Sequence, residues 1–230
     1  MNNDKVKNKL VIIPGISGRM GEEFAKRFNE LGDYEVIGFS SSKEDLSKSI
    51  IKCDLLNKNS IKMILSKFNF DRYSEILIVH SIGLFLFEDE NMPNINELRN
   101  NVYRSDFITF KNITEELTEK INFQKTELTL IAFGSISDEY EVPFWSAYSK
   151  SKIDLKKYIR KSLTSRVRGV FINVSSTEKD DERIYADKTY WLSCNEVSEK
   201  SMPSILNKEP NWQELDIFKI NPDYYNDYFN

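Results

Sequence analysis

A turn with three regularly spaced glycines, set between an apolar run and a helical pattern, constrains the fold of this chain more than any other feature. Leu10-Val11-Ile12-Ile13 is a continuous apolar run, typical of a strand buried on both faces of a parallel sheet. Glycines follow at positions 15, 18 and 21, and residues 22–31 then place apolar side chains at helical spacing. This order of strand, turn and helix is the context that a dinucleotide-binding fingerprint needs.

The glycines have separate roles in such a fingerprint. Gly15 permits the tight turn, Gly18 lets the backbone approach a pyrophosphate, and Gly21 lets the helix pack closely on the strand. The remaining loop residues are further candidates for contact with a dinucleotide: Ser17, Arg19 and Met20. The alternative is a tight loop that binds nothing.

Apolar runs alternate with helical patterns along the rest of the chain. We expect strands at 34–39, 49–55, 76–79, 128–133, 168–174 and 215–220, and helices at 60–68, 95–121, 145–163 and 195–206. This alternation predicts the α/β class, with a single doubly wound parallel β-sheet flanked by helices on both faces. A chain of 230 residues suits one such domain, 1–230.

Composition excludes several classes of function. The net charge is −4, with 32 basic residues scattered among 36 acidic ones, so neither nucleic acid nor an anionic membrane surface is expected as a partner. Two cysteines and a single histidine, His80, provide no metal-binding cluster. The apolar run at 10–13 is too short for a signal peptide or a membrane span, so a soluble, cytoplasmic protein is expected.

The end of the second predicted strand bears on the choice of cofactor. An acidic residue there would bind the adenosine ribose of NAD, but the sequence reads Ser40-Ser41-Ser42-Lys43. Hydroxyl and basic groups can accommodate the 2′-phosphate of NADP, which favours NADP with Ser41, Lys43 and Arg19 as contacts. The alternative is a solvated turn that starts a helix.

A tyrosine and a lysine, Tyr148 and Lys152, lie four residues apart in a predicted helix, so their side chains share one face. An adjacent ammonium favours the phenolate and lowers the pKa of the phenol toward the range useful for acid–base chemistry. The run 128–133 ends in Gly134-Ser135, which can direct the Ser135 hydroxyl at the same reacting oxygen. Ser137 competes for this role, and the spacing prefers Ser135. The alternative is an ordinary surface Tyr–Lys pair.

A serine, then Tyr-x-x-x-Lys 13 residues later, behind an N-terminal glycine turn, resembles the short-chain dehydrogenase/reductase family. The resemblance implies a Rossmann fold and a nicotinamide cofactor. It further implies that Ser135 hydrogen-bonds the substrate oxygen, that Tyr148 transfers the proton, and that Lys152 lowers the pKa of Tyr148 and holds the nicotinamide ribose.

The same resemblance assigns positions around the adenosine and the catalytic lysine. Asp54 and Leu55 would touch the adenine, although Asp54 could equally cap the helix that follows. The family's Asn-Asn-Ala-Gly loop corresponds to His80-Ser81-Ile82-Gly83, where Ser81 and Gly83 would line the cofactor and His80 is expected to be structural. An asparagine that kinks the long helix around a water and connects the lysine to solvent maps onto Asn101, with Asn100 as the other possible register.

Departures from the family pattern leave other functions open. The Pro-Gly pair that commonly follows the sixth strand is replaced by Ser175-Ser176-Thr177, where Ser175 or Thr177 could contact the nicotinamide through a hydroxyl. We expect an NADP-dependent oxidoreductase acting on a small-molecule carbonyl or alcohol. The alternatives are a catalytically silent dinucleotide-binding regulator or assembly protein, and a sugar-nucleotide epimerase or dehydratase. The resemblance also implies a homodimer or homotetramer. The charged stretch near 175–195 is expected to form a substrate loop, and residues 221–230 an aromatic and acidic C-terminal tail.

Overall fold

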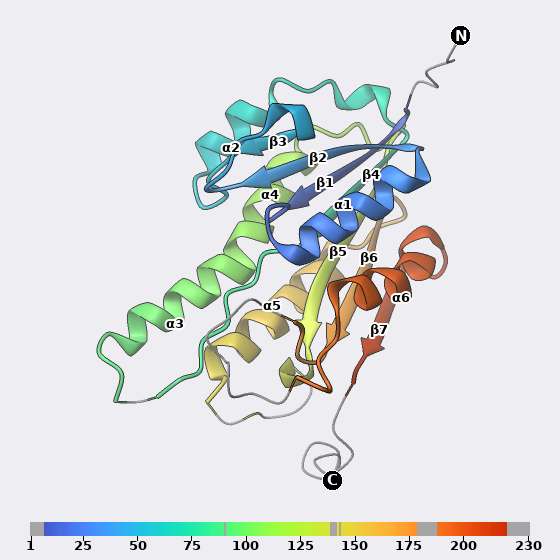
Figure 1. Ribbon diagram of the computed structural model, residues 1–230. Coiled ribbons are helices and arrows are strands. Elements are labelled where there is room, and N and C mark those ends of the chain that lie inside the picture. Colours follow the sequence, from blue (N-terminus) through green and yellow to red (C-terminus); the bar gives the residue numbers. More distant parts are fainter. Residues whose placement is uncertain (1–6, 90, 139–141, 143, 179–187, 220–230) are drawn as a thin grey trace.

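The computed structural model describes residues 7–89, 91–138, 142, 144–178 and 188–219. Its centre is a seven-stranded sheet in which all neighbouring strands are parallel, in the order β3-β2-β1-β4-β5-β6-β7 (Figure 1). The strands are β1 (Lys9–Pro14), β2 (Tyr34–Ser40), β3 (Ile50–Lys52), β4 (Glu75–His80), β5 (Glu127–Ser135), β6 (Val167–Val174) and β7 (Trp212–Ile217).

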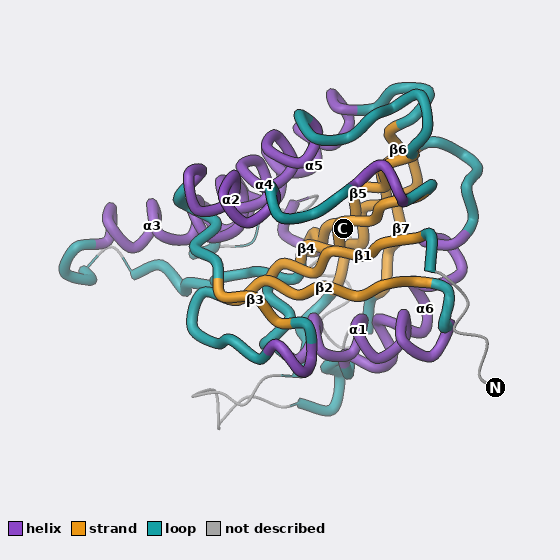
Figure 2. The backbone as a smooth tube through the Cα atoms, turned by 90° about the horizontal axis from the view of Figure 1, so that it is seen from above, coloured by secondary structure: helices purple, strands orange, loops and turns teal. Residues whose placement is uncertain are grey.

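Helices cover both faces of this sheet. They are α1 (Arg19–Leu31), α2 (Lys58–Leu65), α3 (Ile95–Tyr103), α4 (Thr109–Thr118), α5 (Ser146–Ser162) and α6 (Cys194–Leu206). Figure 2 shows α1 and α6 on one face and α2, α4 and α5 on the other. Each layer buries its own hydrophobic cluster against the sheet, as alternate strand residues point to opposite faces. The α/β doubly wound sheet expected from the sequence is therefore confirmed.

The strand order reverses between β1 and β4, and this reversal positions the site. The chain builds β1, β2 and β3 outward in one direction, then returns to place β4 on the other side of β1. The loops after β1 and β4 therefore diverge to opposite faces and leave a crevice at the carboxyl ends of the strands. Both predicted clusters of site residues follow strands at this edge.

Several elements differ from the sequence-based expectation, and α2, expected at 60–68, spans Lys58–Leu65. The third strand covers only Ile50–Lys52 because it pairs with β2 alone, and Asp54 Oδ1 accepts a bond from the Leu56 amide that turns the chain. The last strand begins at Trp212, three residues before the predicted 215. The long helix predicted at 95–121 is interrupted by a π-helical turn, Arg104–Ile108, between α3 and α4. Residues 179–187 of the predicted substrate loop and the tail at 221–230 lie outside the described residues.

Candidate active site

The glycine turn follows β1 and presents the start of α1 to the crevice. Gly15 has φ +82°, in the left-handed region that favours glycine, and its amide donates to the Phe39 carbonyl. Gly18 is the N-cap of α1, and no side chain in the described part of the chain caps this end. The first amide groups of a 13-residue helix are thus available to an anion, with the helix dipole favouring negative charge.

The space around the glycines fits the roles expected for a phosphate-binding turn. A Cβ placed on Gly21 would lie 2.4 Å from the Gly15 carbonyl oxygen and 2.7 Å from Ser81 Oγ, so a side chain cannot be accommodated there. A Cβ placed on Gly18 would meet the Gly15 carbonyl oxygen alone, at 3.4 Å. Gly21 therefore serves close packing, whereas the space over Gly18 remains open to a ligand.

A crevice of about 460 Å³ extends from this turn across the ends of β1, β2 and β4. It is lined by nine of the residues singled out in the sequence: Gly15, Ser17, Gly18, Ser41, Asp54, Leu55, Ser81, Gly83 and Asn101. Four other candidates do not line it: Arg19, Met20, Gly21 and Lys43. An elongated crevice with backbone amides at one end and small polar side chains along its walls fits a dinucleotide.

Hydroxyl groups hold the end of β2 against the glycine turn. Ser17 Oγ lies 3.0 Å from Ser40 Oγ, which also accepts a bond from the Lys43 amide. Ser41 is exposed and faces the crevice. On the adjacent wall, Asp54 does not cap α2, because Asn57 does, so the alternative role for Asp54 is wrong.

The second cluster lies at the start of α5. Tyr148 and Lys152 share one face of the helix, and Lys152 Nζ lies 5.0 Å from the centre of the Tyr148 ring. Ser135 is the last residue of β5, and its side chain interacts with the Tyr148 phenol in the sense that lowers the pKa of Tyr148. Ser137 donates to Ser135 Oγ from its amide and its hydroxyl, so it supports Ser135 rather than replacing it.

One charged residue of this cluster escaped the sequence analysis. Asp106 is fully buried in the π-helical turn, and its Oδ2 lies 3.0 Å from Lys152 Nζ. Its Oδ1 accepts from the Leu84 amide, directly after Gly83. The signal was present, because Asp106 interrupts an otherwise apolar stripe in which Val102 and Phe110 lie four residues to either side, both buried.

This geometry corrects the position assigned to Asn101. The irregular turn spans Arg104–Ile108, whereas Asn101 is an exposed residue of α3 that lines the dinucleotide crevice. The side chain that faces Lys152 from this helix is Asp106. The sequence placed the interruption in the correct helix but at Asn101, three residues before the turn begins, because the pair of asparagines determined the assignment.

The acidity expected for Tyr148 is also corrected. Burial raises the pKa of Tyr148 above its usual range, and although Lys152 and the Ser135 hydrogen bond lower it, Asp106 and Asp138 raise it further. Burial alone would lower the pKa of Lys152, but the charge of Asp106 outweighs burial and raises it. Lys152 is therefore a fixed cation at neutral pH, and its effect on the phenol is partly cancelled by its own counter-ion.

His80 is structural, as expected from the sequence. It is buried at the end of β4, its Nε2 lies 2.9 Å from Thr109 Oγ1, and its ring packs edge-on against Phe110. Burial first, and the charge of Lys152 second, lower the pKa of His80 to about 3. The imidazole is neutral at physiological pH and does not exchange protons with the site.

A second, partly buried ion-pair group lies one helical turn beyond Lys152. Lys156 Nζ is 2.8 Å from Asp138 Oδ2 and 2.5 Å from Glu214 Oε1. Asn173 on β6 donates to the same Glu214 carboxylate. Asp138 closes the short helix Ile136–Asp138 that follows Ser135, so this group fixes the segment that leads out of the catalytic strand.

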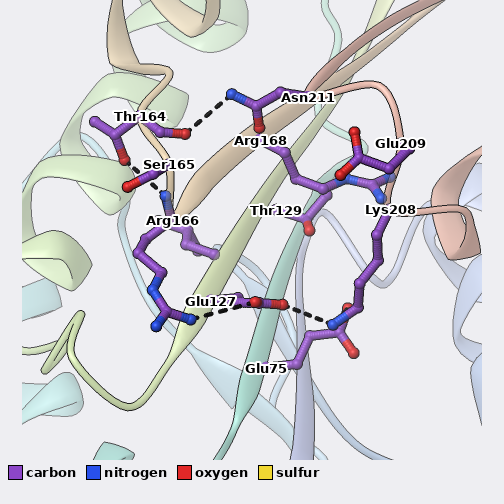
Figure 3. Close-up of a pocket in the computed structure, with 11 residues that line it drawn as sticks. Glu75, Glu127, Thr129, Thr164, Ser165, Arg166, Arg168, Lys208, Glu209 and Asn211 are labelled. Atoms are coloured by element: carbon purple, nitrogen blue, oxygen red, sulfur yellow. Dashed lines mark hydrogen bonds and ion pairs between the residues drawn. The ribbon is translucent and has the colours of Figure 1, made fainter.

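A further cavity of about 370 Å³ opens at the opposite, amino-terminal edge of the sheet (Figure 3). Several of its charged side chains are paired across the opening, since Glu127 binds both Arg166 and Lys208. Arg168 donates to the carbonyls at the end of α6, of Ser204 and Ile205 among others. These contacts join the amino-terminal ends of the strands to the end of α6. They lie at the opposite end of the sheet from Tyr148.

Metal-dependent chemistry has no ligand cluster in the described ranges. Within 7–89, 91–138, 144–178 and 188–219, no three His, Cys, Asp or Glu side chains are grouped so as to hold a metal ion. The helices of the same part of the chain are all too short or too polar to cross a membrane.

No protein-family model and no curated protein sequence matches this chain. Solved structures match over nearly the whole length. A serine dehydrogenase from Escherichia coli has 18% identity, covers 90% of this chain and 96% of its own, and superposes with a TM-score of 0.73. The chain has the same fold as this dehydrogenase.

Two further structures with this fold contain a dinucleotide. A short-chain dehydrogenase from Burkholderia cenocepacia, in complex with NADP, has 11% identity and a TM-score of 0.74, covering 92% of this chain and 89% of its own. An alcohol dehydrogenase from the archaeon Thermococcus sibiricus, complexed with 5-hydroxy-NADP, has 16% identity and a TM-score of 0.73, covering 92% and 97%. At such identities the likeness establishes that this chain shares the fold of these dehydrogenases, and the activity is argued from the site itself.

Proposed function

We propose that this protein is an oxidoreductase of the short-chain dehydrogenase/reductase type, transferring hydride between NADP(H) and a carbonyl or secondary-alcohol substrate. The observation that carries the proposal is that the dinucleotide crevice and the Tyr–Lys cluster meet at Gly83. Gly83 lines the crevice, and a Cβ placed on it would lie 3.7 Å from Lys152 Nζ. A dinucleotide with its pyrophosphate at Gly18 can thus extend toward Tyr148.

Each residue of the cluster has a role in this reaction. A bound nicotinamide supplies or accepts the hydride at the substrate carbon. Tyr148 gives its proton to the carbonyl oxygen during reduction and takes it back during oxidation. Ser135 donates a hydrogen bond to the same oxygen, and Lys152, kept cationic by Asp106, stabilises the phenolate and the cofactor ribose.

The preference for NADP rests on the end of β2. Ser41 lines the crevice there, Lys43 follows two residues later, and no acidic residue is present between Ser40 and Lys43. An anionic 2′-phosphate at the end of β2 would meet hydroxyl and amide donors, with no carboxylate on the segment 40–43 itself. The NADP in the Burkholderia structure and the 5-hydroxy-NADP in the Thermococcus structure agree with this preference.

We also propose that the protein forms a homodimer or homotetramer through the helical layer that contains α3, α4 and α5, as the family resemblance implies. Light scattering during size-exclusion chromatography tests this directly. An elution mass of 27.0 kDa, the mass of one chain, would contradict it.

The proposed activity is tested by NADPH binding together with Tyr148→Phe. Titration should quench or shift NADPH fluorescence, and a panel of carbonyl compounds should reveal NADPH consumption that Tyr148→Phe reduces by about 10²–10⁴-fold without weakening NADPH binding. Tyr158→Phe is the matched control, because Tyr158 lies on the same helix with its ring packed against Phe107 and Phe110, away from the crevice. Binding without turnover that depends on Tyr148 would instead support a dinucleotide-binding regulator.

A further inference from the structure

A small cavity beside Tyr148 has walls of two different chemical kinds. It is lined by Phe85, Ser135, Ile136, Trp145, Tyr148, Val174, Ser175, Ser176 and Thr177. Among the residues that the structure describes, no wall of this cavity carries an acidic or basic side chain. One half is aromatic and aliphatic, and the other half carries hydroxyl groups.

The aromatic half is a set of rings packed edge to face. The Phe85 ring centre lies 4.8 Å from that of Trp145 and 5.5 Å from that of Tyr148, with interplanar angles of 78° and 80°. Trp145 and Tyr148 are themselves 6.3 Å apart at 87°. Rings that contact one another in this way leave no cage for a cation, but they offer a rigid apolar surface to a flat group.

Two hydroxyl groups of the other half, those of Ser135 and Ser175, are engaged by the protein's own bonds. Ser135 Oγ is bonded by Ser137 and interacts with Tyr148. Ser175 Oγ accepts from the Lys219 amide. The Leu192 amide donates to the Ser176 carbonyl and so fixes the backbone of this wall rather than its hydroxyl groups. This wall therefore provides hydrogen bonds for the reacting oxygen, and the lining that the structure describes contains no cation to pair with a charged group of a substrate.

A buried carboxylate fixes the segment that carries Phe85. Glu88 is 3% exposed, and its oxygens accept from the Ala147 amide at 2.6 Å, Ser146 Oγ at 2.7 Å and Arg99 Nε at 2.6 Å. Its own amide donates to the Phe144 carbonyl. Burial would raise the pKa of Glu88, but these bonds outweigh burial and lower it, so the carboxylate is charged. The segment is thereby attached to the first turn of α5, beside Tyr148.

We propose that the substrate is uncharged and carries a flat apolar group, such as an aryl ring, next to its reacting carbonyl or hydroxyl. Phe85 and Trp145 determine this specificity by packing against the flat group, while Ser135 and Tyr148 hold the oxygen. The inference rests on the proposed function and adds the chemical class of substrate. A substrate that carries a carboxylate would have to leave its charge unpaired against these walls, which is costly.

Matched ketones and variants test this class. For wild type we expect kcat/KM for acetophenone to exceed that for phenylglyoxylate, which adds a carboxylate, and that for cyclohexyl methyl ketone, which is apolar but not flat, by at least about tenfold. Phe85→Leu and Trp145→Leu should each lower kcat/KM for acetophenone about three- to tenfold and leave NADPH binding unchanged. Phe87→Leu is the matched control, because Phe87 belongs to the same segment but is 53% exposed and packs on Phe144 outside the cavity.

A binding measurement separates failure of this inference from failure of the proposed function. Saturation-transfer NMR with the NADPH-bound protein should show acetophenone bound to wild type and to Phe87→Leu, and more weakly to Phe85→Leu. If the enzyme turns over charged or aliphatic carbonyls in preference to aryl ketones, the inference about the substrate class is wrong, but the proposed oxidoreductase function is still supported. If no carbonyl is turned over, the proposed function fails. Acetophenone binding that depends on Phe85 would then still support the aromatic site, and its absence would overturn it.

Discussion

The carboxylate of Asp106 lies 3.0 Å from the ammonium of Lys152, and the two side chains are 0% and 3% exposed. The Asp106 carboxylate also bonds the Leu84 amide and the Ser151 hydroxyl, so it joins the π-helical turn, the loop after β4 and the catalytic helix. A charge pair this deeply buried is stable only when both partners are present. It makes the lysine a permanent cation and at the same time limits how far that cation can acidify Tyr148.

The first prediction concerns the strength of this pair. Asp106→Asn and Lys152→Met should each lower the free energy of unfolding by about 3–5 kcal/mol, because each leaves one buried charge without its partner. The double variant should lose less than the sum of the two single losses, giving an interaction energy of about 1–3 kcal/mol. Urea denaturation of wild type, the two single variants and the double variant measures this double-mutant cycle. Strictly additive losses would show that the two side chains do not interact.

The second prediction concerns the pH dependence of the reaction. Because burial raises the pKa of Tyr148, reduction, which needs the protonated phenol, should be independent of pH through neutrality. Oxidation, which needs the phenolate, should increase steadily into the alkaline range. Ser135→Ala removes a hydrogen bond that lowers this pKa, so the alkaline limb should move to higher pH. Ser137→Ala is the control, and a larger shift for it than for Ser135→Ala would reverse the roles of the two serines.

The fold was predictable because its signals are local. Buried parallel strands read as continuous apolar runs, and helices repeat their apolar residues every three to four positions, so the alternation alone implies a doubly wound sheet. Strand ends were less predictable, since β3 is an edge strand that ends at Lys52, where a turn at Asp54 replaces pairing. No local pattern marks that end.

The sequence predicts those candidate site residues that stand at fixed spacings in a motif. It does not predict the residue that reaches the site only through a tertiary contact. Gly15, Ser135 and Tyr148 stand at fixed distances from strands and helices, and the structure brings their elements to one edge of the sheet. Asp106 is linked to Lys152 only across space, 46 positions away along the chain. In the sequence, Asp106 is visible only as an acidic residue within an apolar helical stripe. The spacing of residues along the chain does not show that it is the counter-ion of Lys152.

The third prediction separates the packing glycine from the ligand glycine. Gly21→Ala should destabilise the protein by about 2 kcal/mol or more, because its Cβ would overlap the Gly15 carbonyl and Ser81. Gly18→Ala should unfold like wild type but bind NADPH at least about tenfold more weakly, since its Cβ would stand where a pyrophosphate approaches. Thermal unfolding and NADPH titration measure the two effects.

Gly32→Ala is the control for this pair. Gly32 has φ +73° at the end of α1, with no atom within 4 Å of a Cβ placed there, so the change introduces backbone strain without a clash. It should cost about 1 kcal/mol of stability and leave NADPH binding unaffected. Normal NADPH affinity in Gly18→Ala would place the pyrophosphate elsewhere.

The fourth prediction concerns the choice of cofactor. Ser41→Asp places a carboxylate on the crevice wall at the end of β2, where it should repel a 2′-phosphate and accept a bond from a free ribose hydroxyl. The ratio of the dissociation constants for NADPH and NADH should rise by about tenfold or more. Ser42→Asp, one residue further and outside the crevice lining, is the matched control. An unchanged ratio in Ser41→Asp would locate the adenosine away from β2.

The last prediction concerns the second, partly buried ion-pair group. Lys156→Met leaves the buried Asp138 carboxylate without its cation, whereas Glu214 keeps Arg160, and should destabilise the fold by about 3 kcal/mol at neutral pH. Burial already raises the pKa of Asp138, and loss of Lys156 raises it further, so the destabilisation should shrink as the pH falls and the carboxylates take up protons. Lys150→Met is the control, because the exposed Lys150–Asp154 pair should contribute less than about 1 kcal/mol. Urea denaturation at pH 4.5 and 7.5 measures the free energy of unfolding of the variants and of wild type. An equal loss of stability at both pH values would mean that Lys156 acts through packing of its aliphatic stem.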